Sequence, residues 1–378
     1  MRGFKYSIWD LYEELTKDKE KWNYYADIDI KNTAQDLFDN TNALLFIKSA
    51  FKKGSKDRAL DIVYRDNCEI SQYRSNHTLS AYLLGIILRD RLNIDMKELP
   101  QIEDRAPTKN FLYFWSLTCL YHDYAFSVEE KSKEFVEDIR DIDDFTKHFN
   151  ITHSMLDGSE FKDLIVNYFN YRIKENGVID HGIAGAMLFY DGLIKQYIEA
   201  MEEEGITKKQ SFTHHGLKYS REYKEHILFV ANTIAQHNMW RANEFTALQY
   251  KNHHLEELIP NSNNTHKISF YDSGKGQKNK LLFLLCLIDT IEPIKCLGRD
   301  KNKNPITNPY IVLEKLKISF DKNEKNFSIC CPEKYFSDYM NSIRGISDWM
   351  DVELVPDENE GLFTISINKP AQQELSVA

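Results

Sequence analysis

The chain has 378 residues, 42% of them hydrophobic, so it can bury a large core in one domain or two smaller ones without disulfides. Its formal net charge of −10 opposes attraction to a polyanion, because nonspecific nucleic-acid affinity comes from Lys and Arg that neutralise phosphates. Binding to extended duplex is therefore not expected.

The cysteines and the apolar runs indicate the cellular compartment in which the protein is expected. The six cysteines form no C-x-x-C pair, which favours reduced thiols and a cytoplasmic location. The N-terminal sequence MRGFKYSIWDLYEELTKDKEKW lacks an apolar signal core, and the longest apolar run, at 281–288, is too short to cross a bilayer. We therefore expect a cytoplasmic protein that makes no membrane contact.

Helices are predicted along the chain up to about residue 296, because apolar residues recur there at three- and four-residue spacing and proline is rare. The clearest predicted helices cover residues 44–51, 79–88, 111–122, 179–197, 223–237 and 280–291. Stretches between them, such as 261–280 with NSNNT and SGKGQ, have the composition of loops.

The pattern changes after about residue 305. Alternating apolar residues predict strands at 307–320, 325–331, 352–355 and 362–368, and a helix is predicted between the second and third at 332–350. These elements predict a small C-terminal ββαββ appendage. The expected fold class is mainly α, a helical bundle that carries this α+β appendage.

Three predicted domains follow from these elements. Residues 1–70 form an N-terminal helical extension packed on the body, 71–300 form the helical domain with insertions, and 305–370 form the small α+β subdomain.

Histidine and aspartate side chains occur where the predicted helices should be buried. His122 and Asp123 follow the apolar stretch FLYFWSLTCLY, and Asp289 lies within LLFLLCLIDTIEPI. A buried carboxylate is costly unless a cation or a donor satisfies it. His77 lies at the start of a further helix, and ligands from separate buried helices are the usual way to hold a metal in a helical bundle. We therefore expect His77, His122, Asp123 and Asp289 to be metal ligands.

Two further histidines extend this set. His181 in VIDHGIAGAMLFY and His237 in FVANTIAQHNMW lie on or beside apolar helical faces, and a second ion could bind there with Asp123 as the bridging carboxylate. Asp180 fits a helix cap as well as a catalytic role. The tandem pair at 214–215 lies in polar surroundings typical of a surface, and it remains an alternative to His237.

The order His77, His122-Asp123, Asp289 resembles the HD superfamily of metal-dependent phosphohydrolases. The HGIAGA sequence around His181 is similar to the HSxxGA-like motif of the HD nuclease domains of CRISPR-associated helicase-nucleases. The resemblance covers roughly residues 70 to 300. Those nucleases commonly carry two adjacent histidines where this chain has Gln236-His237, which is a departure from their pattern.

The resemblance implies an HD-domain helical bundle and a phosphohydrolase or phosphodiesterase, in which a metal-activated water attacks a phosphate ester of a nucleotide or a single-stranded nucleic acid. The implied cofactor is one or two divalent ions of Mn, Ni, Co, Fe or Zn, with Mg as a further candidate. Asp123 and Arg74 are the expected catalytic residues, because Arg74 shares a helical face with the first ligand and suits a phosphate oxygen. Substrate contacts are expected from Arg74, Tyr124, Gln236 and Lys278.

Two other functions fit the same residues. Some HD-fold proteins bind a di-iron centre through six ligands of these types and oxidise a C–H bond with O₂. The other alternative is a non-catalytic HD scaffold that binds a nucleotide within a larger assembly, with the C-terminal subdomain as the docking surface for a protein partner. The complete ligand set favours an enzyme.

Overall fold

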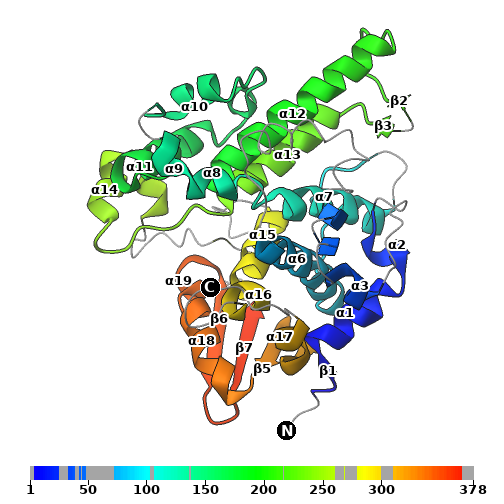
Figure 1. Cartoon of the computed structure of the whole chain (residues 1–378), viewed down its shortest axis with the longest axis vertical. Coiled ribbons are helices and arrows are strands. Elements are labelled where there is room, and N and C mark those ends of the chain that lie inside the picture. The colour runs from blue at the N-terminus through cyan, green and yellow to red at the C-terminus, as the bar shows by residue number, and fades with distance from the viewer. Residues whose placement is uncertain are drawn as a thin grey trace, which may run out of the picture. The chain divides into compact units, whose positions relative to one another are not determined.

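The computed structural model describes residues 4–24, 33–38, 42–43, 45–47, 72–102, 106–135, 138–215, 217–259, 268, 279–298 and 310–367. Helices predominate within these ranges, as the apolar spacing predicts (Figure 1). The chain divides into two compact units, each built from separated segments. The sheet unit comprises Met1–Leu11, Gly85–Glu98 and Asn261–Ala378. The helical unit comprises Tyr12–Leu84 and Leu99–Pro260.

Each unit combines segments that were predicted to lie in different domains. The predicted domain boundaries stay a prediction. Two helices contribute residues to both units: α1 (Ile8–Thr16) and α6 (Gln72–Arg91). Within the described ranges, no helix has both the length and the apolar character needed to cross a membrane.

The sheet unit contains one antiparallel sheet in the strand order β1-β4-β5-β7-β6. Its further elements are β1 (Tyr6–Ser7), α15 (Lys280–Ile291), α16 (Pro293–Leu297), α17 (Tyr310–Lys315), β4 (Lys317–Asp321), β5 (Asn326–Cys330), α18 (Glu333–Ile343), α19 (Ile346–Trp349), β6 (Val352–Asp357) and β7 (Leu362–Ile367). On the buried face, Phe327 lies opposite Ile365 and Ile329 lies opposite Phe363. Tyr339 of α18 packs on Phe363 with ring centroids 5.0 Å apart, so α18 covers this face.

The predicted strand at 307–320 is wrong over residues 310–315, which form α17, and residues 307–309 lie outside the described residues. Val312, Leu313 and Leu316 are buried at helical spacing, whereas a strand would have buried every second side chain. Strands β5, β6 and β7 lie within or close to the predicted segments 325–331, 352–355 and 362–368. The pairing of β1 with β4 was not predicted, because a two-residue strand has no sequence period.

The predicted helix at 79–88 lies in α6, which contributes to both units. The helical unit carries the predicted helices at 111–122, 179–197 and 223–237, in α7, α12 and α13. Its further elements are α2 (Lys19–Trp22), α3 (Ala34–Phe38), α7 (Pro107–Tyr121), α8 (Phe126–Glu130), α9 (Ser132–Phe135), α10 (Ile142–His148), η1 (Met155–Asp157), α11 (Lys162–Asn176), α12 (His181–Glu203), β2 (Phe212–His214), β3 (Leu217–Tyr219), α13 (Tyr223–Gln236), α14 (Ala247–Asn252) and η2 (Glu256–Leu258). Only part of the predicted helix at 44–51 is described, and residues 45–47 are helical there.

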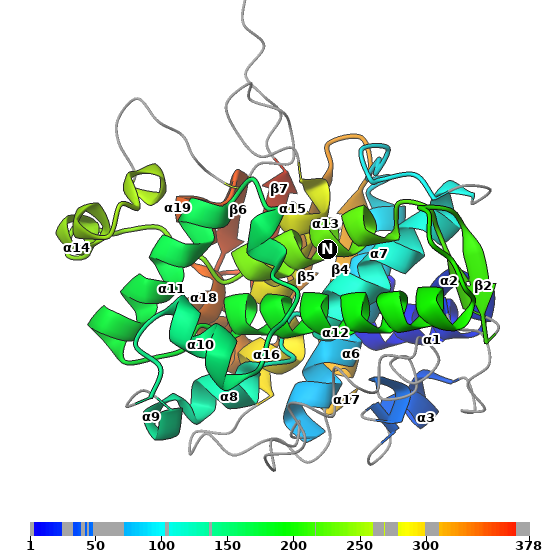
Figure 2. The same cartoon turned by 90° about the horizontal axis from the view of Figure 1, so that it is seen from above.

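The core of the helical unit forms around α7, which is buried from Asn110 to Tyr121. This full burial explains why its sequence is apolar on every face. Trp115 donates its indole N–H to the carbonyl oxygen of Tyr82 at 2.9 Å and so joins α7 to α6. Helices α12 and α13 lie side by side (Figure 2) and carry the remaining predicted histidines to this core.

A buried carboxylate on α12 gives a test of this packing. Asp191 accepts hydrogen bonds from the backbone N–H groups of Thr152 at 2.9 Å and His153 at 2.8 Å, and it pairs with Lys195 at 2.6 Å. Asp191→Ala should lower the free energy of unfolding by about 3 kcal/mol, because it leaves these hydrogen-bond donors without an acceptor. Asp191→Asn keeps an acceptor oxygen and should cost less. Urea unfolding measures both variants, and equal midpoints for the alanine variant and the wild type would contradict the assignment.

Candidate metal centre

The His122-Asp123 pair lies where α7 ends, with His122 as the C-cap. The Nδ1 atom of His122 is 2.6 Å from the carbonyl oxygen of Cys119. Because a carbonyl oxygen only accepts, this contact assigns the proton to Nδ1 and leaves the lone pair on Nε2. Nε2 of His122 is therefore the nitrogen that is oriented to bind a metal ion.

His237 repeats this arrangement at the end of α13. It is the C-cap of that helix, and its Nδ1 is 2.6 Å from the carbonyl oxygen of Ile234. Its Nε2 is therefore again the ligand atom. Gly182 makes the approach of this ring possible, because a Cβ atom at that position would lie 3.1 Å from the ring of His237. The glycine that follows His181 thus lets the start of α12 and the end of α13 come together.

His181 is the first residue of α12, and Asp180 caps that helix. Oδ1 of Asp180 accepts a hydrogen bond from the backbone N–H of Ile183 at 3.0 Å, which confirms the capping interpretation of this residue. The cap fixes where α12 begins and therefore where the imidazole of His181 projects.

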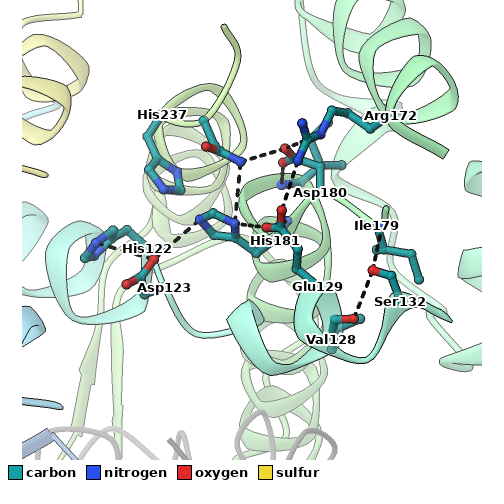
Figure 3. A network of polar contacts seen from close by, with 12 residues as sticks. His122, Asp123, Val128, Glu129, Ser132, Arg172, Ile179, Asp180, His181 and His237 are labelled. Carbon is teal, nitrogen blue, oxygen red and sulfur yellow. Dashed lines mark hydrogen bonds and ion pairs between the residues drawn. The ribbon is translucent and has the colours of Figure 1, made fainter. Parts of the chain in front are cut away.

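A carboxylate orients the His181 ring (Figure 3). Nδ1 of His181 contacts Oε2 of Glu129, and Oε1 of Glu129 accepts a hydrogen bond from Arg172 at 2.9 Å. Burial alone would raise the pKa of Glu129, but the bond to His181 and the charge of Arg172 lower it below its ordinary value. Glu129 therefore stays ionised and holds the Nε2 atom of His181 toward Asp123, 3.4 Å from Oδ1.

The Asp123 carboxylate lies among the imidazoles, only 8% exposed. Its Oδ1 is 3.8 Å from Nε2 of His122, and its Oδ2 is 3.6 Å from Nε2 of His77. Ligand atoms of Asp123, His181 and His237 all lie within 4.8 Å of one another. The rings of His77 and His122, of His122 and His237, and of His181 and His237 have centroids 5.6, 5.3 and 5.2 Å apart. Five predicted ligands therefore converge in the helical unit.

Arg74 lies beside this cluster. Its Nη1 atom is 2.8 Å from Oδ2 of Asp123, and its guanidinium carbon lies 3.3 Å from the centroid of the Phe126 ring. Arg74 and His77 thus approach the same oxygen from one face of α6, as their spacing predicts. Burial alone would raise the pKa of Asp123, but positive charge on His122, Arg74 and His77 lowers it well below its ordinary value. The centre accordingly presents an ionised carboxylate.

Two predicted substrate contacts are part of the core. Tyr124 is only 2% exposed and its ring packs on Tyr121 with centroids 5.6 Å apart. Gln236 is buried and donates from Nε2 to the carbonyl oxygen of Asn232 at 3.0 Å. Packing accounts for both side chains, and their contact with a substrate stays a prediction.

Three other candidate residues are not among the five that converge in the helical unit. Asp289 is on α15 in the sheet unit, where it accepts a hydrogen bond from Lys295 at 2.6 Å, and its role as a ligand stays a prediction. Lys278 lies outside the described residues. His214 contacts Glu204 in the β2–β3 hairpin and is separate from the five converging ligands.

The residues that support the predicted ligands were not predicted from the sequence. Glu129, Arg172 and Asn238 are polar residues in mixed sequence, which is typical of solvated surfaces. Their partners are 43 to 58 residues away along the chain, and no short motif signals such a contact. The only local signal was the Asp180 cap, whose Oδ2 accepts a hydrogen bond from Asn238 at 2.8 Å.

The described cluster can hold a divalent metal ion. Four imidazoles and one carboxylate suit Zn, Mn, Fe, Co and Ni better than Mg, which prefers oxygen ligands. No known protein family matches the chain, and neither a curated protein nor a solved structure matches it at a significant level.

The orientation of His181 can be tested through Glu129. Glu129→Ala removes the acceptor that fixes the ring, so we expect metal affinity to fall by about 10- to 100-fold. Glu130→Ala, at the exposed neighbouring position, is the matched control and should leave affinity unchanged. Titration with Zn²⁺ against a competing chelator measures both; equal affinities for the two variants would contradict a positioning role.

The two glycines of the HGIAGA sequence allow a second test. Gly182→Ala should push the His237 ring away by a few tenths of an ångström and weaken metal binding, because its Cβ would lie 3.1 Å from that ring. Gly185→Ala is the control, since its Cβ would meet Ala125 at an ordinary 3.6 Å. Both changes favour the helix by up to about 1 kcal/mol. Weaker metal binding in the Gly185 variant than in the Gly182 variant would refute this account.

Proposed function

We propose that the protein is a metal-dependent phosphohydrolase that cleaves a phosphate ester of a nucleotide or of a single-stranded nucleic acid. The observation that supports this proposal is the convergence of four imidazoles on one buried, ionised carboxylate, Asp123. A structural role alone would not require such a set, because apolar side chains fill a core at lower cost. The residue order of the HD superfamily adds to the argument.

The donors fit a metal because their protons are already placed. His122 and His237 each donate from Nδ1 to a carbonyl oxygen, so the Nε2 atom of each is the nitrogen left to bind an ion. A divalent ion bound here would lower the pKa of a water molecule and stabilise the negative charge that develops on the phosphoryl oxygens.

We further propose that Asp123 bridges two ions. Its Oδ1 faces His181 and its Oδ2 faces His77, so the two oxygens point toward different imidazoles. A carboxylate shared by two ions a few ångströms apart requires this arrangement. Asp289, a carboxylate within the apolar segment LLFLLCLIDTIEPI, stays the predicted sixth ligand.

Arg74 is the residue best placed to bind the phosphate ester. It holds Oδ2 of Asp123 at 2.8 Å, and a guanidinium has further N–H groups that can pair with a phosphate oxygen. In this proposal Arg74 both orients the carboxylate and neutralises the substrate.

The test of the proposal combines metal content with hydrolysis. We expect about two equivalents of divalent metal in the purified protein, and turnover of bis(p-nitrophenyl) phosphate with added Mn²⁺, Ni²⁺ or Co²⁺. Asp123→Asn should lower the turnover at least about 1000-fold and reduce the metal content, because it removes the only carboxylate of the converging set. Circular dichroism checks that the variant is folded.

A matched pair of histidines supplies the control. His122→Ala should remove metal and activity, whereas His148→Ala, which changes the same residue type at an exposed position of α10, should preserve both. Hydrolysis retained by the folded Asp123→Asn variant would contradict the proposal. Bound iron with an O₂-dependent spectral change and no hydrolysis would instead favour the di-iron oxygenase, and absence of metal would favour the binding scaffold.

A further inference from the structure

The segment that follows His237 is held in place by two tyrosines. The backbone N–H of Trp240 donates to the hydroxyl of Tyr168 at 3.0 Å, and that hydroxyl donates to the carbonyl oxygen of Asn238 at 3.2 Å. The hydroxyl of Tyr250 donates to the carbonyl oxygen of Trp240 at 2.9 Å. Hydrogen bonds therefore fix both the backbone N–H group and the backbone carbonyl group of Trp240.

The same polar network that supports the metal ligands also holds the indole of Trp240. Its Nε1 donates to Oδ1 of Asn238 at 3.1 Å, and Nδ2 of Asn238 donates to Oδ2 of Asp180 at 2.8 Å. Asp180 in turn caps the helix that begins with His181. Two hydrogen bonds thus join the indole to the start of the helix that presents a ligand, yet Trp240 is 47% exposed. An ordered and exposed aromatic ring beside the centre is a surface on which a planar group can stack.

Arg241 follows immediately and lacks an anionic partner within the part of the chain that the structure describes. Its Nη2 atom is buried without a hydrogen-bond acceptor there, although the residue as a whole is half-buried. Burial lowers the pKa of the Arg241 guanidinium, and no acid among the described residues offsets this effect. A desolvated cation of this kind is costly unless an anion pairs with it, and a ligand can supply that anion.

We propose that Trp240 and Arg241 form the recognition site for a nucleoside phosphate, with the base stacked on the indole and a phosphate paired with the guanidinium. This inference rests on the proposed function for its link to hydrolysis and narrows the substrate to one that carries a nucleobase. A phosphate ester without a base would gain no stacking contact with the indole. The net charge of −10 favours a free nucleotide or a strand end over a long polyanion.

The neighbouring exposed residues Phe245 and Leu248 could instead mark a protein-docking surface, since they are 82% and 69% exposed. The hydrogen bonds described above tether Trp240, and its neighbour Arg241 supplies the charge that a phosphate needs. A nucleoside phosphate, which carries both a base and a phosphate, therefore fits Trp240 and Arg241 better than a protein partner does.

Binding measurements with the full chain test the inference. The probes are AMP, a short oligodeoxythymidine, and ribose 5-phosphate as a ligand with a phosphate and no base, measured by calorimetry. We expect Trp240→Ala to weaken AMP about 10- to 100-fold and to leave ribose 5-phosphate unchanged, because only the stacking is lost. Trp240→Phe should keep most of the affinity, and Arg241→Gln should weaken both AMP and ribose 5-phosphate. Tighter binding of the oligonucleotide with the same dependence on Trp240 would assign a strand end, and tighter binding of AMP a free nucleotide.

Metal content, measured in each variant, separates this inference from the proposed function. Trp240→Ala and Arg241→Gln should keep the metal content of the wild type, because neither residue is a ligand. Unchanged AMP and oligonucleotide affinities in both variants, or no binding of either probe by metal-loaded wild type, would overturn the inference and leave the hydrolase proposal standing. If Trp240→Ala fails to fold, Arg241→Gln decides the question, together with quenching of tryptophan fluorescence by AMP, which should be seen in the wild type and lost in Trp240→Phe.

Discussion

The buried carboxylate of Asp123 is the charge on which the arrangement of the helical unit's centre depends. An isolated anion in a protein interior is destabilising by several kcal/mol, so positive or hydrogen-bonding groups must surround it. Arg74 supplies a permanent charge at 2.8 Å, and the imidazoles supply the rest of the shell. The ends of α7 and α13 and the start of α12 meet at this point because each brings one of those groups to it.

The histidines of the centre differ in the group that contacts their Nδ1 atom. His122 and His237 are backed by carbonyl oxygens of their own helices, whereas His181 is backed by the carboxylate of Glu129. A carboxylate behind an imidazole raises its basicity more than a neutral carbonyl does. Burial alone would lower the pKa of His181, but Glu129 and Asp123 raise it above its ordinary value. We therefore expect Glu129 to strengthen His181 as a donor to the ion.

The sequence alone predicted most of the long helices and the ligands that converge, because both follow from local patterns. Apolar spacing predicted α7, α12 and α13, and polar residues at the ends of apolar helices predicted His122, His181 and His237. Contacts between distant segments could not be predicted in this way, as the bond between Glu129 and His181 shows. The short helix α17 was mistaken for a strand because its apolar run was too brief to reveal its period.

X-ray absorption spectroscopy at the edge of the metal bound to the full chain tests the central claim most directly. We expect nitrogen and oxygen neighbours at about 2.0–2.2 Å, with scattering from several imidazole rings that declines in His181→Ala but not in His148→Ala. Sulfur neighbours at about 2.3 Å, or oxygen neighbours without imidazole, would contradict it, because the ion would then lie elsewhere than among His77, His122, Asp123, His181 and His237.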